Sequence, residues 1–121
     1  MDMVALQQKL VEFADERDWD VFHTPKNLAM ALAGEAGELL AEFQWLTAAQ
    51  SSALSVEQHT VIKYEMADVL LYLLRLADKL DVDLEQAAIE KIALNAQKYP
   101  VDLAKGNALK YNKLGGETGG C

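Results

Sequence analysis

The stretch that decides the fold is residues 55–80, which read SVEQHTVIKYEMADVLLYLLRLADKL. Ser55, followed three residues later by Gln58, is the pattern of a capping box and predicts that a helix begins here. Apolar residues recur along the segment at helical spacing, which predicts a buried seam on one face of that helix. The predicted seam consists of Ile62, Met66, Val69, Leu73, Leu76 and Leu80.

Two acids, Glu65 and Asp68, lie beside this seam rather than opposite it. Residues three apart on a helix share a face, so both carboxylates project in one direction. Residues 25–46 form another apolar helical stretch, and it carries a second such pair, Glu35 and Glu38. If the two helices pack antiparallel, four acids meet in a small volume, where protons or cations must neutralise them. Hard cations prefer oxygen ligands, so the pattern predicts a shared Mg²⁺ site in which Mn²⁺ can substitute.

Acidic pairs on helices can also be solvated surface residues that bind no ligand. The positions of these residues in the sequence support a metal site and a solvated surface about equally. Gly34 and Gly37 flank Glu35 inside the predicted helix. Each costs about 1 kcal/mol relative to alanine there. Their presence predicts that a ligand or another helix approaches the backbone closely at this point.

Start and stop signals place the other helices. Thr24 followed by Pro25 is an N-cap with a proline at the first helical position, a clear helix start. Asp83 resembles another cap, and Pro100 stops the last helix. The predicted helices cover residues 2–17, 25–46, 55–80 and 83–99. Because Leu and Ala dominate the apolar residues, we expect an all-α fold, a four-helix-bundle type with antiparallel helices.

The length of 121 residues predicts a single domain, residues 1–113, followed by a flexible Gly-rich tail at residues 114–121. The segment after the last helix is basic, with Lys105, Lys110 and Lys113, and reads as irregular. Helices this apolar in so short a chain are expected to leave an apolar face for a partner subunit.

The net charge of −8 argues against a protein that binds nucleic-acid polymers, which would carry a basic surface. Cys121 is the single cysteine, so a disulfide framework and a thiolate metal site are both excluded. Acidic residues among the first sixteen are unlike a signal peptide, and no apolar run approaches the length that spans a bilayer. We therefore expect a cytoplasmic protein with no membrane partner.

Two further sets of residues have the chemistry to bind a phosphorylated ligand. Lys91, Asn95 and Lys98 share one face of the last helix, with Tyr99 beside them, and two cations and an amide suit phosphate oxygens. The alternative for this set is a solvated basic stripe. Four amphipathic side chains could stack on a nucleobase, although taken singly each is more often part of a core or interface. These are Trp19, His23, Trp45 and Tyr72.

The motifs GEAGEL at residues 34–39 and EMADVL at residues 65–70 resemble a known signature. It is the E-x-x-E…E-x-x-D pattern of the MazG-like, all-α nucleoside triphosphate pyrophosphohydrolases. The resemblance extends to the dCTP pyrophosphatase branch, through ERDW at residues 16–19 and AEFQW at residues 41–45. It covers nearly the whole chain, from about residue 5 to residue 113.

The resemblance implies an enzyme that hydrolyses a dNTP, with dCTP favoured, to a monophosphate and pyrophosphate, in nucleotide-pool sanitation. It also implies a homodimer, or a homotetramer built as a dimer of dimers, with sites near the subunit contacts. The implied Mg²⁺ ligands and catalytic acids are Glu35, Glu38, Glu65 and Asp68. The implied phosphate ligands are Lys91, Asn95, Lys98 and Tyr99, and the implied base pocket is Trp19, His23, Trp45 and Tyr72.

Two alternatives stay open at this point. The first keeps the site but changes the substrate to dUTP or a modified nucleotide, because stacking on aromatic side chains tolerates every base. The second is a non-catalytic helical dimerisation module. It predicts no nucleotide binding and no stabilisation by Mg²⁺ and nucleotide, whereas a real site would stabilise the folded state.

Overall fold

The computed structural model describes residues 1–108, which form helices and turns and contain no strand. The four long helices are α1 (Met3–Glu16), α2 (Pro25–Ala41), α4 (Val56–Lys79) and α5 (Leu84–Lys98). Three short helical turns lie between or after them: η1 (Asp20–Phe22), α3 (Ala48–Ser51) and α6 (Val101–Ala104). The predicted all-α class is confirmed.

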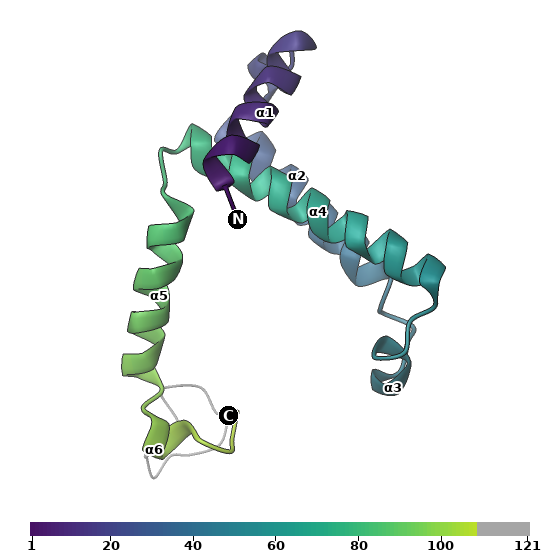
Figure 1. Cartoon of the computed structure of the whole chain (residues 1–121), viewed down its shortest axis with the longest axis vertical. Coiled ribbons are helices and arrows are strands. Elements are labelled where there is room, and N and C mark those ends of the chain that lie inside the picture. Colours follow the sequence, from purple (N-terminus) through teal and green to yellow (C-terminus); the bar gives the residue numbers. More distant parts are fainter. Residues whose placement is uncertain (109–121) are drawn as a thin grey trace. The chain divides into compact units, whose positions relative to one another are not determined.

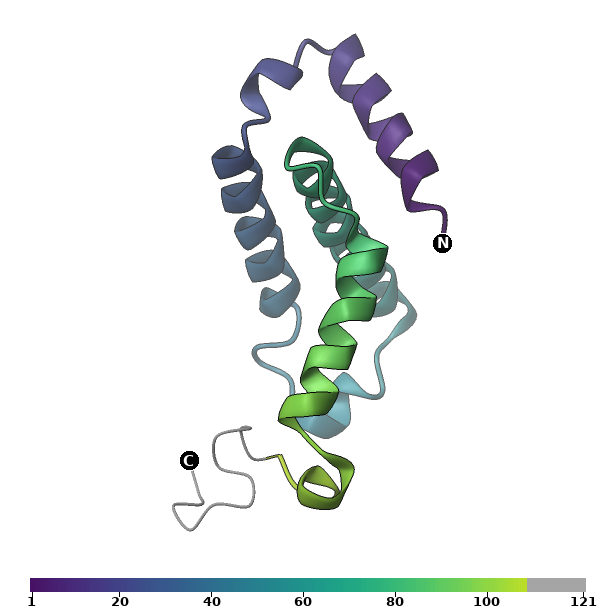
Figure 2. The ribbon, with the colours of Figure 1, turned by 90° about the vertical axis from the view of Figure 1, so that its left-hand side faces the viewer.

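The chain divides into two compact units, Met1–Val82 and Asp83–Cys121. The first unit holds α1, α2 and α4, and the second holds α5 and α6. In the first unit α2 runs antiparallel to α4 and packs along it, while α1 packs against α4 (Figures 1 and 2). The α2–α4 hairpin is the frame that positions the acidic pairs. The predicted tail at residues 114–121 lies outside the described residues.

Side-chain caps fix where the long helices begin. Ser55 and Gln58 form the predicted capping box, with Ser55 Oγ accepting the Gln58 N–H at 3.1 Å. Thr24 Oγ1 accepts the N–H of Asn27 at 3.2 Å, with Pro25 at the first helical position. These caps satisfy donors that a helix start leaves unpaired, which is why local sequence predicted the starts well.

The predicted ends and loops were less accurate. The second helix ends at Ala41 rather than at residue 46. Beyond Ala41 the backbone forms turns with hydrogen bonds between residues three apart, such as the Phe43 N–H donating to the Leu40 carbonyl at 2.9 Å. The predicted loop after it contains α3, which begins with its own capping box between Thr47 and Gln50. The region predicted as irregular after the last long helix contains α6.

The core of the first unit is small, and the predicted seam is wrong at two positions, since Met66 and Leu80 are both exposed. Leu28 on α2 and Leu74 on α4 are its largest fully buried side chains. Ile62 is buried as predicted, but Met66 is 58% exposed. The helix α4 is turned so that Glu65, rather than Met66, lies between Ile62 and the half-buried Val69 on the packing face. The buried apolar side chains are Ala14, Leu28, Ile62, Leu74 and Ala77.

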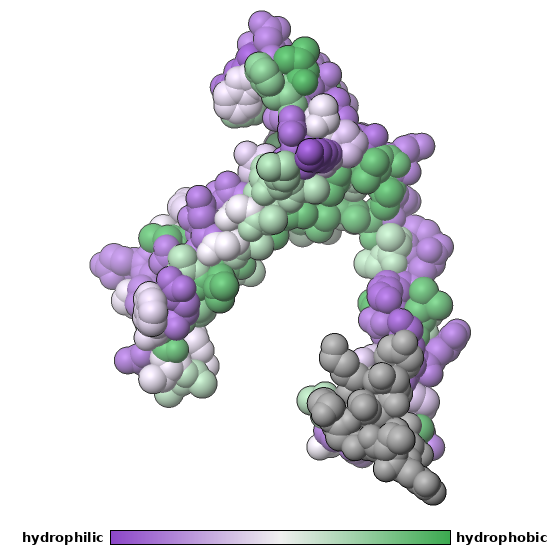
Figure 3. Space-filling view, turned by 180° about the vertical axis from the view of Figure 1, so that it is seen from behind, coloured by the Kyte–Doolittle hydropathy of each residue, from purple (hydrophilic) through white to green (hydrophobic). Residues whose placement is uncertain are grey.

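A polar contact ties α1 to this core, since the side-chain amide of Gln7 donates to the carbonyl of Leu74 at 3.0 Å. Large apolar side chains nevertheless remain on the surface, and Figure 3 shows apolar patches among the polar ones. On α2 and α4 the exposed apolar residues include Met30, Leu40, Val61, Tyr64 and Met66. Among the described residues, no helix combines the length and the apolarity that a membrane span requires.

Candidate functional site

The α2–α4 hairpin brings three acids together. One carboxylate oxygen from each of Glu35, Glu38 and Glu65 lies within 4.8 Å of the other two. Glu35 is half-buried on α2, and Glu65 is half-buried on α4, whereas Glu38 is exposed. The cluster therefore has two acids from the packing faces of two helices and a third at its solvent side.

Two oxygens in this cluster lack a hydrogen-bond donor. Oε2 of Glu35 and Oε2 of Glu65 are buried, and among residues 1–108 neither has a hydrogen-bond partner. Burying a carboxylate oxygen without a donor is unfavourable, so such atoms are normally paired, protonated or bound to a cation. Because one oxygen of Glu35 on α2 lies within 4.8 Å of one oxygen of Glu65 on α4, the two side chains have an arrangement that a shared cation would satisfy.

The raised pKa values in the cluster also favour binding of a proton or a cation. The pKa of Glu35 is raised to about 7, chiefly by burial and then by the neighbouring carboxyls of Glu38, Asp68 and Glu65. Burial also raises the pKa of Glu65, with Glu38 as the next cause. Protons and a divalent cation therefore compete for the same oxygens near neutral pH.

Two other acids act on the cluster from its edge. Asp68 is exposed and does not belong to the group of three converging oxygens, but its charge helps raise the pKa values of Glu35 and Glu65. Its role as a metal ligand stays a prediction. Glu42 was not among the predicted site residues, but its charge also raises the pKa of Glu65. Its spacing, four residues after Glu38, was the signal that could have found it.

We expect the stability of the metal-free protein to show the raised pKa of Glu35. A carboxyl with a higher pKa in the folded state binds more protons there, so its stabilisation is complete below pH 4.5 and is lost as pH rises through about 7. Glu35→Gln cannot ionise. The melting temperature of the wild type, measured in chelator, should therefore fall relative to that of Glu35→Gln across this window.

The pKa of His23 is lowered from 6.5, chiefly by burial. The stabilisation that comes from neutral His23 is therefore lost as pH falls below 6.5, whereas the stabilisation from Glu35 is lost as pH rises. Because both proteins keep His23, its effect cancels in the difference between their curves. Glu12→Gln, on the exposed side of α1, is the matched control and should follow the wild type. Parallel curves for wild type and Glu35→Gln would contradict the raised pKa.

The structure does not gather the four predicted base-binding residues in one copy of the first unit. Trp19 and His23 precede α2, while Trp45 follows it and is 86% exposed. The 17 residues of α2 span about 25 Å at the rise of an α-helix. Tyr72 is half-buried on α4. A pocket that contains all four residues would need more than one copy of the chain, and its composition stays a prediction.

The predicted phosphate-binding residues lie on the second unit. Lys91, Asn95 and Lys98 are exposed on α5, with the spacing that the sequence predicted. Tyr99 is the C-cap of α5, and its backbone N–H donates to the Asn95 carbonyl at 2.9 Å. Their binding of phosphate stays a prediction.

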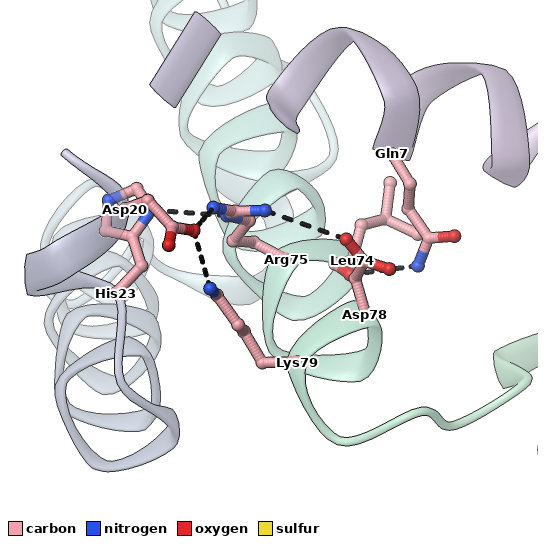
Figure 4. Close-up of polar contacts among 7 residues, drawn as sticks. All are labelled: Gln7, Asp20, His23, Leu74, Arg75, Asp78 and Lys79. Carbon is pink, nitrogen blue, oxygen red and sulfur yellow. Dashed lines mark hydrogen bonds and ion pairs between the residues drawn. The ribbon is translucent and has the colours of Figure 1, made fainter. Parts of the chain in front are cut away.

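A second polar cluster, around Arg75, was not predicted. Arg75 on α4 is only 5% exposed, and its Nε–H donates to Nδ1 of His23 at 3.2 Å (Figure 4). Its Nη2 pairs with Asp20 at 2.7 Å, and its Nη1 lies 3.6 Å from a carboxylate oxygen of Asp78. Lys79 also pairs with Asp20, at 2.6 Å. The sequence signal was an arginine inside the apolar stretch LLRLA, where a charge needs buried partners.

Comparison with known proteins places the chain in a family. A profile of the MazG-like family matches residues 31–114, a range that includes the three-acid cluster and the whole of α5. The chain belongs to the MazG-like family. The fold of the chain is also similar to that of a solved structure, a pyrophosphatase from Archaeoglobus fulgidus, with a TM-score of 0.78 and 38% sequence identity. The match covers 83% of this chain and 94% of that one.

MazG-like relatives named dCTP pyrophosphatase 1 are 47% identical to this chain in rat and 43% identical in human, over 105 residues. These matches confirm the predicted resemblance to the dCTP pyrophosphatase branch. Each covers 85% of this chain but 62% of the relative, so this chain spans less than two thirds of the relatives' length.

Proposed function

We propose that this MazG-like chain is an enzyme, a nucleoside triphosphate pyrophosphohydrolase. It cleaves a dNTP, with dCTP favoured, between the α and β phosphates to give dNMP and pyrophosphate. The observation that carries the proposal is the pair of buried oxygens of Glu35 and Glu65, which lack a donor among residues 1–108. The names of the relatives support the substrate class. Removal of unwanted nucleotides from the cellular pool is the role that such an activity serves.

The donor set fits Mg²⁺, with Mn²⁺ as a substitute. The converging ligand atoms are all carboxylate oxygens, the hard ligands that these cations prefer. Glu35, Glu38 and Glu65 would hold the cation, with Asp68 as the proposed fourth ligand. When bound, the cation supplies charge neutralisation and Lewis acidity at the triphosphate.

The chain's own residues would do the rest of the chemistry. Because Glu35 and Glu65 project from two packed helices, their oxygens are held in place before substrate arrives. A carboxylate that is not committed to the cation would accept the proton of the attacking water. The proposed ligands for the phosphate oxygens and the departing pyrophosphate are Lys91, Asn95, Lys98 and Tyr99, and the lysines would offset its negative charge.

Recognition of the base and assembly of the oligomer are linked in this proposal. Trp19 and His23 lie at one end of α2 and Trp45 at the other, so a base pocket built from all of them with Tyr72 needs a second copy. The exposed apolar residues of α2 and α4 offer a surface for that copy. We therefore propose a cytoplasmic homodimer or homotetramer, with nucleotides as ligands and neither a nucleic-acid polymer nor a membrane as partner.

A panel of dNTPs with product identification tests the function. With Mg²⁺ we expect dCMP and pyrophosphate, the highest kcat/KM for dCTP, and no turnover in chelator. Release of orthophosphate would contradict the reaction class. A preference for dUTP or a modified nucleotide would support the first alternative. If there is no turnover, and Mg²⁺ with nucleotide does not raise the melting temperature, the chain is the dimerisation module instead.

A further inference from the structure

Arg75 is the charged residue that the described part of the chain buries. Each of its three guanidinium nitrogens has its own neighbour, His23, Asp20 or Asp78, and Figure 4 shows the group between them. A planar guanidinium that meets three partners in different directions has a single favourable orientation. Arg75 therefore fixes the position of His23 relative to α4.

This contact also decides which nitrogen of His23 carries a proton. A neutral imidazole has one N–H and one acceptor nitrogen. Since Nδ1 accepts the Nε–H of Arg75, the proton of His23 must lie on Nε2. Burial, then the positive charges of Arg75 and Lys79, lower the pKa of His23 and keep it neutral near pH 7, while Asp20 partly opposes them. The ring thus offers Nε2–H, a donor, on the side turned away from Arg75.

We propose that Arg75 is a positioning residue for base selection, which holds His23 as the Nε2–H tautomer so that His23 donates to an acceptor on the base. This inference rests on the proposed function, in which His23 contacts the base. The pairing edge of cytosine offers acceptors at O2 and N3, whereas N3 of uracil and thymine carries a hydrogen. A histidine whose Nε2–H points at N3 of the base can form a hydrogen bond with cytosine. With uracil, the Nε2–H of His23 would meet the N3–H of the base, so two donors would face each other without an acceptor.

Nitrogen-15 NMR of the histidine side chains tests the first half of the proposal without any turnover. The chain has two histidines, and His59, exposed near the start of α4, is the internal reference. We expect His23 to be neutral near pH 7 with its proton on Nε2. Arg75→Met should lose this preference, and Asp78→Asn, which leaves the Arg75–His23 contact in place, should keep it. A proton on Nδ1 in the wild type, or an unchanged tautomer in Arg75→Met, would overturn the proposal.

Kinetics test the second half. In Arg75→Met we expect KM for dCTP to rise roughly tenfold, with little change in kcat, and the preference for dCTP over dUTP to fall by about the same factor. Asp78→Asn should keep the wild-type preference. A purely structural Arg75 would lower the melting temperature but leave the preference unchanged, and that result would overturn the inference. If the wild type hydrolyses no dNTP, the proposed function fails and base selection with it, while the NMR result still reports whether Arg75 sets the tautomer.

Discussion

Glu38→Gln is expected to slow the Mg²⁺-dependent release of pyrophosphate from dCTP by about a thousandfold, equivalent to about 4 kcal/mol of transition-state stabilisation. The amide keeps the shape of the side chain but removes the negative charge from the three-acid cluster. Glu38 is the exposed member of that cluster, so the replacement removes a ligand without opening a cavity in the core. The measurement is the initial rate of pyrophosphate release at saturating Mg²⁺.

The controls separate a lost ligand from a lost fold. Glu38→Gln should melt at or above the wild-type temperature in chelator, because it removes repulsion from Glu35 and Glu65. Glu12→Gln should retain the full rate. Asp68→Asn should lose less activity than Glu38→Gln, since Asp68 stands outside the group of converging oxygens. If Glu38→Gln released pyrophosphate at the wild-type rate, the three-acid cluster would not be part of the active site.

Local signals in the sequence predicted most of the fold. The caps at Thr24 and Ser55 act within a single turn, so no knowledge of tertiary structure is needed to recognise them. The convergence of Glu35 with Glu65 could also be predicted, because a three-residue spacing places two acids on one face of each helix and an antiparallel hairpin brings these faces together. These features depend on few residues that are close in sequence.

The parts that failed depend on packing between distant residues. Residues 69–74 of α4 are apolar almost all the way round, so periodicity could not decide whether Glu65 or Met66 faces α2. The Arg75 cluster joins residues more than fifty positions apart, from η1 and its flanks to the end of α4. The four predicted base-binding residues, Trp19, His23, Trp45 and Tyr72, were chosen because their side chains can stack on a base. Residue type does not tell where each one lies relative to the two ends of α2.

Leu74→Ala is expected to reduce the free energy of unfolding by about 3 kcal/mol, because it leaves a cavity where the side chain is completely buried. In a unit with so small a core this loss is a large part of the total stability. Urea denaturation followed by circular dichroism measures it. Met66→Ala is the matched variant on the same helix, and at 58% exposure it should cost under about 1 kcal/mol while weakening self-association.

The same pair of variants tests the geometry of the proposed active site. Glu65 and Met66 are neighbours on α4, so their side chains point about 100° apart around the helix axis. A rotation that buried Met66 would carry Glu65 away from Glu35 and separate the two oxygens that lack donors. If Met66→Ala cost as much as Leu74→Ala in a protein shown by light scattering to be monomeric, α4 would have the predicted orientation instead. The carboxylates could not then share a cation within one chain.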